Sequence, residues 1–412
     1  MDYPRARHDV EFIPFDYEGR PMILVRDRLG LVPYGTGVPS GLLPVLALMD
    51  GQRSLDDLSR EITALQGGRE VGREDILSVL AELDAAGLLD TERYRTAKAA
   101  AEAAFAGETT RQAMFAGQAY PDTPQLLGPY LDAILEQASG TSGASAPPAE
   151  AIRAVIAPHI DPEAGKAVYA AAYAPLRGAA PRRVVVLGVG HQIIKGLYCL
   201  TEKAYATPFG DVPADKEAVS RLRRAGGGCV DPGDLQHRDE HSVEFQAVFL
   251  RHVLANAPDA PFSLVPILCG TPRGVLAAPT RQAFLETAGG FLDALRALVA
   301  EPGTLVVAGV DFCHIGPKFG HDKPATALEE AALAHDAALL DALAAGDAAA
   351  FWAESARVDD VYNVCGLTAL ATLAEILPPT TMTVLGRDIM REPPTASAVT
   401  FAAAAFTDRT AR

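Results

Sequence analysis

The stretch that decides the fold is residues 306–314, which reads Val-Val-Ala-Gly-Val-Asp-Phe-Cys-His. A short apolar run that ends abruptly in polar side chains is typical of a buried strand in an α/β sheet. Two earlier runs share this pattern: residues 154–158 stop at His159, and residues 184–190 stop at His191. Because the chain has only nine histidines, three such strand ends predict one crevice that holds a metal ion or an acid–base centre.

The surrounding sequence, from about residue 150 onward, alternates apolar runs with segments of helical spacing. This alternation predicts an α/β fold with a mostly parallel sheet and helices on both faces. Helices are expected at about 124–137, 163–173, 215–224, 240–254 and 367–377, with two alanine-rich helices over 325–355, and later strands at 262–268, 383–385 and 397–401.

Residues 1–95 predict a small separate domain with the element order of a winged helix. Short strands are expected at 21–25 and 31–34, a leucine-rich helix up to Met49, a helix capped by Ser54, and a helix at 73–86 before a wing strand at 88–89. Residues 46–90 resemble the PqqD-like peptide-binding domains. Since residues 1–95 carry 17 acids against 11 arginines and no lysine, we expect a peptide partner, added at the sheet edge, rather than DNA.

Between the two parts, residues 96–110 are alanine-rich and predict a helical linker, so that the main domain covers residues 111–412. A second segment, residues 139–148, has the composition of a flexible loop.

Composition narrows the partners and the compartment. The formal charge of −16 comes from 52 acids against 36 bases, which disfavours nucleic acid because phosphate contacts need clustered Lys and Arg. The first residues have no apolar core behind a basic head, so we expect no signal peptide, and no apolar run approaches the roughly 18 residues of a membrane span. The five cysteines are an odd number without a CxxC pair, so we expect no disulfide framework and a cytoplasmic protein.

The strand-end histidines predict a ligand pair. His159 and His191 follow two strands that are separated by one helix, so in a parallel sheet they could lie side by side. A third ligand is required, and spacing alone leaves four candidates open: Cys365, Asp311, His314 and Glu244. Imidazole and thiolate suit zinc, copper and iron.

Other interpretations of these residues involve proton transfer or nucleophilic attack. Asp311 and His314 could form a pair in which the carboxylate orients the imidazole as general acid or base. His241 and Glu244 lie one helical turn apart and would share a face. A metal-free hydrolase would use Cys313 or Cys365 with His314, although Cys313 is more typical of a packed core thiol.

A family resemblance rests on seven blocks that occur in a fixed order. They are Ile-Ala-Pro-His (156–159), Leu-Gly-Val-Gly-His (187–191), Thr-Pro-Phe-Gly-Asp (207–211), Glu-His-Ser-Val-Glu (240–244), Val-Pro-Ile-Leu-Cys-Gly (265–270), Asp-Phe-Cys-His (311–314) and Val-Cys-Gly (364–366). With these blocks, residues 110–407 are identified as a member of the Memo family, called AmmeMemoRadiSam system protein B in bacteria and archaea. Tyr120 falls where the family carries a tyrosine near its start.

The resemblance implies a fold similar to the LigB-like class III extradiol dioxygenases, which hold non-haem iron with two histidines and a carboxylate. In the Memo family a cysteine replaces the carboxylate, so the implied metal ligands are His159, His191 and Cys365. The implied metal is iron or copper, with zinc also possible. His314 matches the acid–base histidine of the dioxygenases, and Asp311 and His241 are implied to lie close to the metal.

Two functions follow from this resemblance. The first is a metal-dependent redox or dioxygenase-like enzyme that acts with radical-SAM and AMMECR-type partners. The second is a non-catalytic metal- or peptide-binding assembly protein for a radical-SAM system. The chain departs from the family after His159, where Ile160-Asp161-Pro162 replaces Ala-Gly-Tyr, and after His191, where Gln192 replaces a histidine; both changes would reshape the mouth of the pocket.

Overall fold

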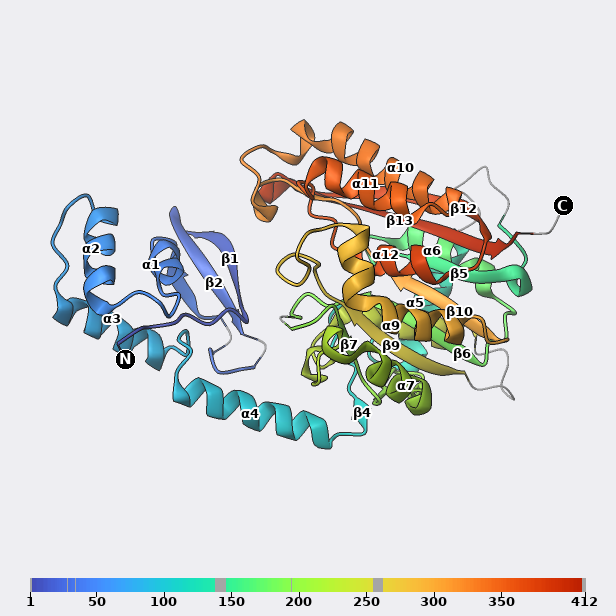
Figure 1. Ribbon diagram of the computed structural model, residues 1–412, viewed down its shortest axis with the longest axis horizontal. Coiled ribbons are helices and arrows are strands. Elements are labelled where there is room, and N and C mark those ends of the chain that lie inside the picture. Colours follow the sequence, from blue (N-terminus) through green and yellow to red (C-terminus); the bar gives the residue numbers. More distant parts are fainter. Residues whose placement is uncertain are drawn as a thin grey trace. The chain divides into compact units, whose positions relative to one another are not determined.

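The computed structural model of the chain describes residues 2–27, 29–33, 35–137, 146–193, 195–254 and 262–409. The chain divides into two compact units, residues 1–107 and residues 108–412 (Figure 1). Most of the loop predicted at 139–148 lies outside the described residues.

The N-terminal unit combines a small antiparallel sheet with helices. Its sheet has the order β1-β2-β3. The strands are β1 (Val10–Tyr17), β2 (Arg20–Asp27) and β3 (Gly37–Pro39), and the helices are α1 (Leu42–Leu48), α2 (Leu55–Leu65), α3 (Arg73–Ala85) and α4 (Glu92–Gly107).

Local sequence signals explain the helices of this unit. Ser54 caps α2, since its side chain accepts from the backbone N–H of Asp57 while the Asp57 carboxylate accepts from that of Ser54. The predicted wing strand is reduced to an isolated bridge between Ala6 and Leu89. The expected linker helix is part of α4, which begins at Glu92 and ends the N-terminal unit. The winged-helix class of this unit stays a prediction.

The C-terminal unit is a mixed α/β structure. Its strands are β4 (Thr110–Arg111), β5 (Ile152–Ala157), β6 (Arg183–Val189), β7 (Tyr198–Leu200), β8 (Ala204–Tyr205), β9 (Ser263–Cys269), β10 (Thr304–Gly309), β11 (His314–Ile315), β12 (Thr380–Glu392) and β13 (Ser397–Asp408). Its helices are α5 (Pro124–Leu135), α6 (Lys166–Tyr173), α7 (Lys216–Gly226), α8 (His241–Val253), α9 (Arg281–Val299), α10 (Glu329–Ala345), α11 (Ala348–Val358) and α12 (Leu367–Ile376).

The main sheet has eight strands in the order β11-β13-β5-β10-β6-β9-β7, with β12 paired to β13. The central strands β5, β10, β6 and β9 are parallel to their neighbours within this group. The outer pairings are antiparallel, and the β12–β13 hairpin has the longest run of paired residues among them. The sheet is therefore mixed, and the expectation of a mostly parallel sheet describes only its centre.

The strand order separates the two strands that lead to the histidines. β5 and β6, which lead to His159 and His191, are not neighbours, because β10 pairs with both of them. The strand that leads to Asp311 thus runs between the two strands that lead to the histidines.

Helices cover both faces of the main sheet (Figure 1). Along β5, Ala154 and Ile156 belong to the core cluster that includes residues of α7, α9, α10 and α12, whereas Val155 and Ala157 belong to the cluster that includes residues of α5, α6 and α8. Burial on both faces explains why the central strands are continuous apolar runs rather than alternating ones. Among the described helices, none has the length and apolar character that a membrane crossing requires.

Candidate metal centre

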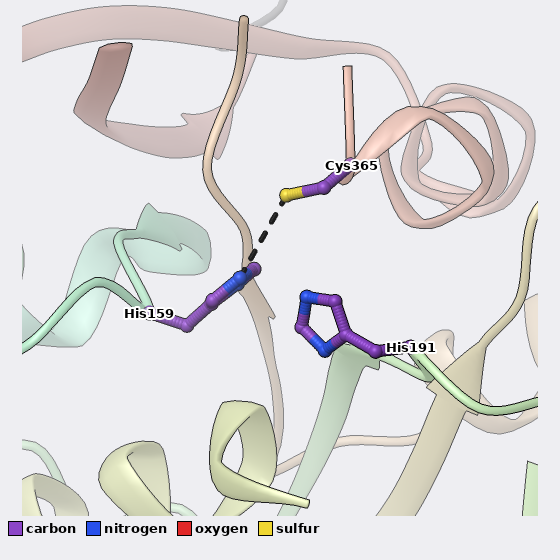
Figure 2. A group of neighbouring side chains, drawn as sticks. All are labelled: His159, His191 and Cys365. Atoms are coloured by element: carbon purple, nitrogen blue, oxygen red, sulfur yellow. Dashed lines mark hydrogen bonds between the residues drawn. The ribbon is translucent and has the colours of Figure 1, made fainter. Parts of the chain in front are cut away.

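Three side chains from distant segments converge at the carboxyl edge of the parallel strands. His159 follows β5, His191 follows β6, and Cys365 lies just before α12. Figure 2 shows the three side chains pointing toward one another. One ligand atom from each residue lies within 4.8 Å of the other two.

His159 is held in one tautomer. Its Nδ1 lies 3.0 Å from the carbonyl oxygen of Gly309, which can only accept, so Nδ1 carries the proton. Burial of the ring lowers the pKa of His159 to about 4, which keeps it neutral. The lone pair is therefore on Nε2, which lies 3.7 Å from Cys365 Sγ.

His191 is held in the same way by a carboxylate. Its Nδ1 lies 3.0 Å from Oε2 of Glu240, the N-cap residue of α8. Burial alone would raise the pKa of Glu240, but His191 and His241 hold that pKa well below its usual range, so the carboxyl is ionised. Glu240 lies within one of the sequence motifs, but no role was predicted for it. The available signal was an acid at the predicted start of a helix, directly before a histidine.

Cys365 completes the cluster. Its Sγ lies 3.4 Å from the carbonyl oxygen of Asp311, and burial raises the pKa of the thiol well above its ordinary value. Gly366 permits the close approach of this loop to the strand end. A Cβ at position 366 would lie 2.5 Å from the Cβ of Val310 and 2.9 Å from the Asp311 carbonyl oxygen.

The donor set fits a transition metal. With metal–nitrogen and metal–sulfur bonds of about 2.0 and 2.3 Å, two ligands of a tetrahedral ion lie about 3.5 Å apart. The observed separation between His159 Nε2 and Cys365 Sγ is 3.7 Å. Two imidazoles and one thiol that would bind as a thiolate suit the borderline-soft ions.

Asp311 is a buried support of this cluster. Its Oδ1 accepts hydrogen bonds from the backbone N–H groups of His159 at 3.0 Å and Ile160 at 3.3 Å, and its Oδ2 lies 3.7 Å from His159 Nε2. His314 is oriented instead by the carbonyl oxygen of Phe312, 3.0 Å from its Nδ1. Asp311 and His314 therefore do not form the expected pair: Asp311 holds the backbone at His159, and His314 bonds to the Phe312 carbonyl.

A cleft of about 470 Å³ opens at the cluster. Its lining includes His191, Cys365 and His314, with Arg273 and Asn363 among the other polar residues. Burial lowers the pKa of His314, so its ring is neutral and its Nε2 can accept a proton.

His241, at the start of α8, adjoins the cluster from another side. The centroid of its ring lies 5.2 Å from that of His159 and 5.3 Å from that of His191. The structure therefore brings His241 together with the two histidines that the sequence analysis paired.

Glu244 does not take part, although the sequence left it open as a third ligand. Its carboxylate accepts from the backbone N–H groups of Met114 at 3.1 Å and Phe115 at 2.9 Å. It also accepts from the side chains of Arg111 and Tyr120. Four donors occupy this buried carboxylate, so Glu244 holds the segment before α5 against α8 rather than facing the cluster.

Cys313 behaves as a packed thiol. It is fully buried, and its Sγ lies 2.9 Å from Oδ1 of Asp336. Burial raises the pKa of the Cys313 thiol, so it is not an activated nucleophile.

Comparison with known proteins gives the family. A family model described as "Memo-like protein" matches residues 111–387. A MEMO1 family protein of Aquifex aeolicus is 27% identical over 297 residues, which cover 72% of this chain and 73% of that protein. A MEMO1 family protein of Thermus thermophilus is 28% identical over 357 residues (85% and 98%), and human Protein MEMO1 is 29% identical over 211 residues (51% and 64%). Because the family model covers more than half of the chain, this protein belongs to the Memo-like family.

Proposed function

We propose that the C-terminal unit binds a transition metal ion through His159 Nε2, His191 Nε2 and Cys365 Sγ. Iron and copper are the preferred ions, and zinc is the third. The observation that carries the proposal is the convergence of one ligand atom from each of these three residues within 4.8 Å, with both imidazoles fixed by bonds at Nδ1. A thiolate among the ligands favours the softer ions.

The activity proposed for this centre is that of a redox or dioxygenase-like enzyme that resembles the class III extradiol dioxygenases. The metal would supply an open coordination position and redox chemistry at the base of the cleft. The cleft would hold the substrate, and His314, which lines it, would accept and return a proton at Nε2. His241 and Asp311 would help to orient the substrate beside the three ligand residues.

The alternative proposal is a non-catalytic metal- or peptide-binding assembly protein for a radical-SAM system. It draws support from the N-terminal unit, where β1 has its described pairing along one side only, with β2. Phe15 and Tyr17 of this edge strand are exposed, which suits the addition of an extended peptide by a PqqD-like winged helix. Partners of the radical-SAM and AMMECR types belong to both proposals, as does a cytoplasmic location, which the five free cysteines support.

The metal-free hydrolase is disfavoured. Burial raises the pKa of the Cys313 thiol and that of the Cys365 thiol, so without a cation neither is a thiolate at neutral pH.

The test is elemental analysis of protein purified without oxygen. We expect near-stoichiometric iron or copper in the wild type and its loss in His159→Ala, His191→Ala and Cys365→Ala. His252→Ala is the matched control, because this histidine lies in the last turn of α8, away from His241, and contacts Asp132 of α5. Wild-type protein that neither contains nor takes up iron, copper or zinc would contradict the proposal.

A second measurement separates the two functions. Oxygen consumption that requires both the metal and a catechol or a partner's product, and that is lost in His314→Gln, would support the enzyme. A loaded protein that consumes no oxygen with any of these, yet binds a partner through residues 1–107, would support the assembly protein.

A further inference from the structure

We infer that Glu240 is the positioning residue of the metal centre: one buried carboxylate fixes the tautomers of His191 and His241 at the same time, and thereby makes His191 Nε2 a ligand atom. The inference rests on the proposed metal site. It concerns a residue outside the ligand set that the sequence implied.

The two carboxylate oxygens of Glu240 bind different partners. Oε2 accepts from His191 Nδ1 at 3.0 Å and from the His191 backbone N–H at 3.3 Å. Oε1 accepts from the backbone N–H groups of His241 at 2.9 Å and Ser242 at 3.1 Å, and lies 3.1 Å from His241 Nδ1. The carboxylate thus joins the segment after β6 to the start of α8.

The surroundings keep this carboxylate in place. Glu240 is 1% exposed, and its backbone carbonyl accepts from the buried guanidinium of Arg111 at 2.7 Å. The hydroxyl of Ser242 donates to the Val189 carbonyl at the end of β6, at 2.8 Å. Since Glu240 is buried at a helix N-terminus and surrounded by donors, it acts as a rigid acceptor of fixed position.

An ionised carboxylate only accepts hydrogen bonds, so each ring that bonds to it must carry a proton on Nδ1. In the neutral rings, the lone pair is then on Nε2. For His191 this is the nitrogen needed for the metal. Carboxylates that bond to the second nitrogen of a ligand histidine commonly set its metal affinity in this way.

The substitution Glu240→Gln gives an asymmetric test, because an amide has one acceptor and one donor. The amide oxygen belongs at the Oε1 position, where two short backbone N–H bonds and His241 need an acceptor. The amide nitrogen then faces His191 Nδ1. That ring must shift its proton to Nε2 and so lose its lone pair for the metal, whereas His241 and His159 keep their tautomers.

The experiment measures tautomers and affinity separately. Nitrogen-15 NMR of the histidine rings is recorded on the metal-free full chain, at a pH well above the ordinary pKa of histidine. Zinc affinity is measured by competition with a chromophoric chelator. Glu354→Gln is the matched control, since Glu354 accepts from His335 Nδ1 at 2.6 Å outside the cluster.

We expect the wild type to show His191 protonated on Nδ1, and Glu240→Gln to show it protonated on Nε2 with zinc binding weaker by about 10- to 100-fold. The control should bind zinc as the wild type does. An unchanged His191 tautomer together with unchanged affinity in Glu240→Gln would overturn the inference.

The wild-type spectrum keeps the test open if the variant fails to fold, because a His191 proton on Nε2 in the wild type would refute the inference directly. It also separates the two proposals. Wild-type protein with the Nδ1 tautomer that binds none of zinc, iron or copper contradicts the metal site but leaves Glu240 as the residue that orients the ring.

Discussion

Glu244→Gln should destabilise the C-terminal unit strongly, because Glu244 is a fully buried acceptor for four donors and the counter-charge of fully buried Arg111. An amide nitrogen at either oxygen position faces two of these donors: Arg111 and the Met114 N–H, or Tyr120 and the Phe115 N–H. Each buried donor without an acceptor costs about 1–3 kcal/mol. With the charge of Arg111 no longer balanced, we expect a total loss of about 3–5 kcal/mol.

The assay is urea unfolding followed by the fluorescence of Trp352. This is the single tryptophan of the chain, and it is buried in α11, so it reports on the C-terminal unit. Glu329→Gln is the control, because its ion pair partner Arg391 is 53% exposed at the surface, so the pair should contribute less than about 1 kcal/mol. A loss in Glu244→Gln no larger than that of the control would refute the reasoning about the buried charge.

Three further outcomes are expected. Gly366→Ala should lower the free energy of unfolding by about 1–3 kcal/mol and weaken zinc binding, because its Cβ would meet Val310 and push the loop of Cys365 away. Trp352 fluorescence measures the first effect, and the chelator competition measures the second. His237 is buried and desolvation lowers its pKa to about 4, so protonation of the unfolded chain should remove up to about 3 kcal/mol as the pH falls from about 6.5 to 4. His237→Gln should lose correspondingly less over that range in urea unfolding at several pH values, and an equal loss would contradict the assignment. Ser54→Ala should cost the N-terminal unit about 1 kcal/mol, measured by thermal unfolding of the unit's far-ultraviolet signal, and no change would mean that the cap of α2 is dispensable.

The strand ends were predictable because their signal is local. β5, β6 and β10 are short apolar runs buried on both faces, and each is followed within a few residues by His159, His191 or Asp311. Sequence alone could not give the strand order, because β10 pairs with β5 and β6 through contacts between residues far apart in the chain.

One helix was missed although part of its signal was present. No element was predicted for the residues of α9, although its buried positions recur at helical spacing from Phe284 to Leu298. Gly289 and Gly290 interrupt the pattern of good helix formers. The structure gives Gly290 a packing reason, since a Cβ there would lie 2.8 Å from the Ala225 carbonyl oxygen of α7.

The supports of the candidate site were the hardest part to foresee. Glu240 meets His191 across 49 residues, and Glu244 meets Arg111 across 133 residues. Such contacts depend on which segments the fold brings together, so the sequence could suggest a carboxylate near the cluster but not its partner.

The pairing of β13 with β5 has a consequence for when the centre can form during synthesis. Ala404 pairs with Ile156, three residues before His159, and Cys365 is separated from His159 by 206 positions in sequence. Loops of this length make the closing steps slow and late. A nascent chain therefore exposes His159 and His191 long before Cys365 emerges, and the three side chains can be held together only after residues 397–408 have left the ribosome.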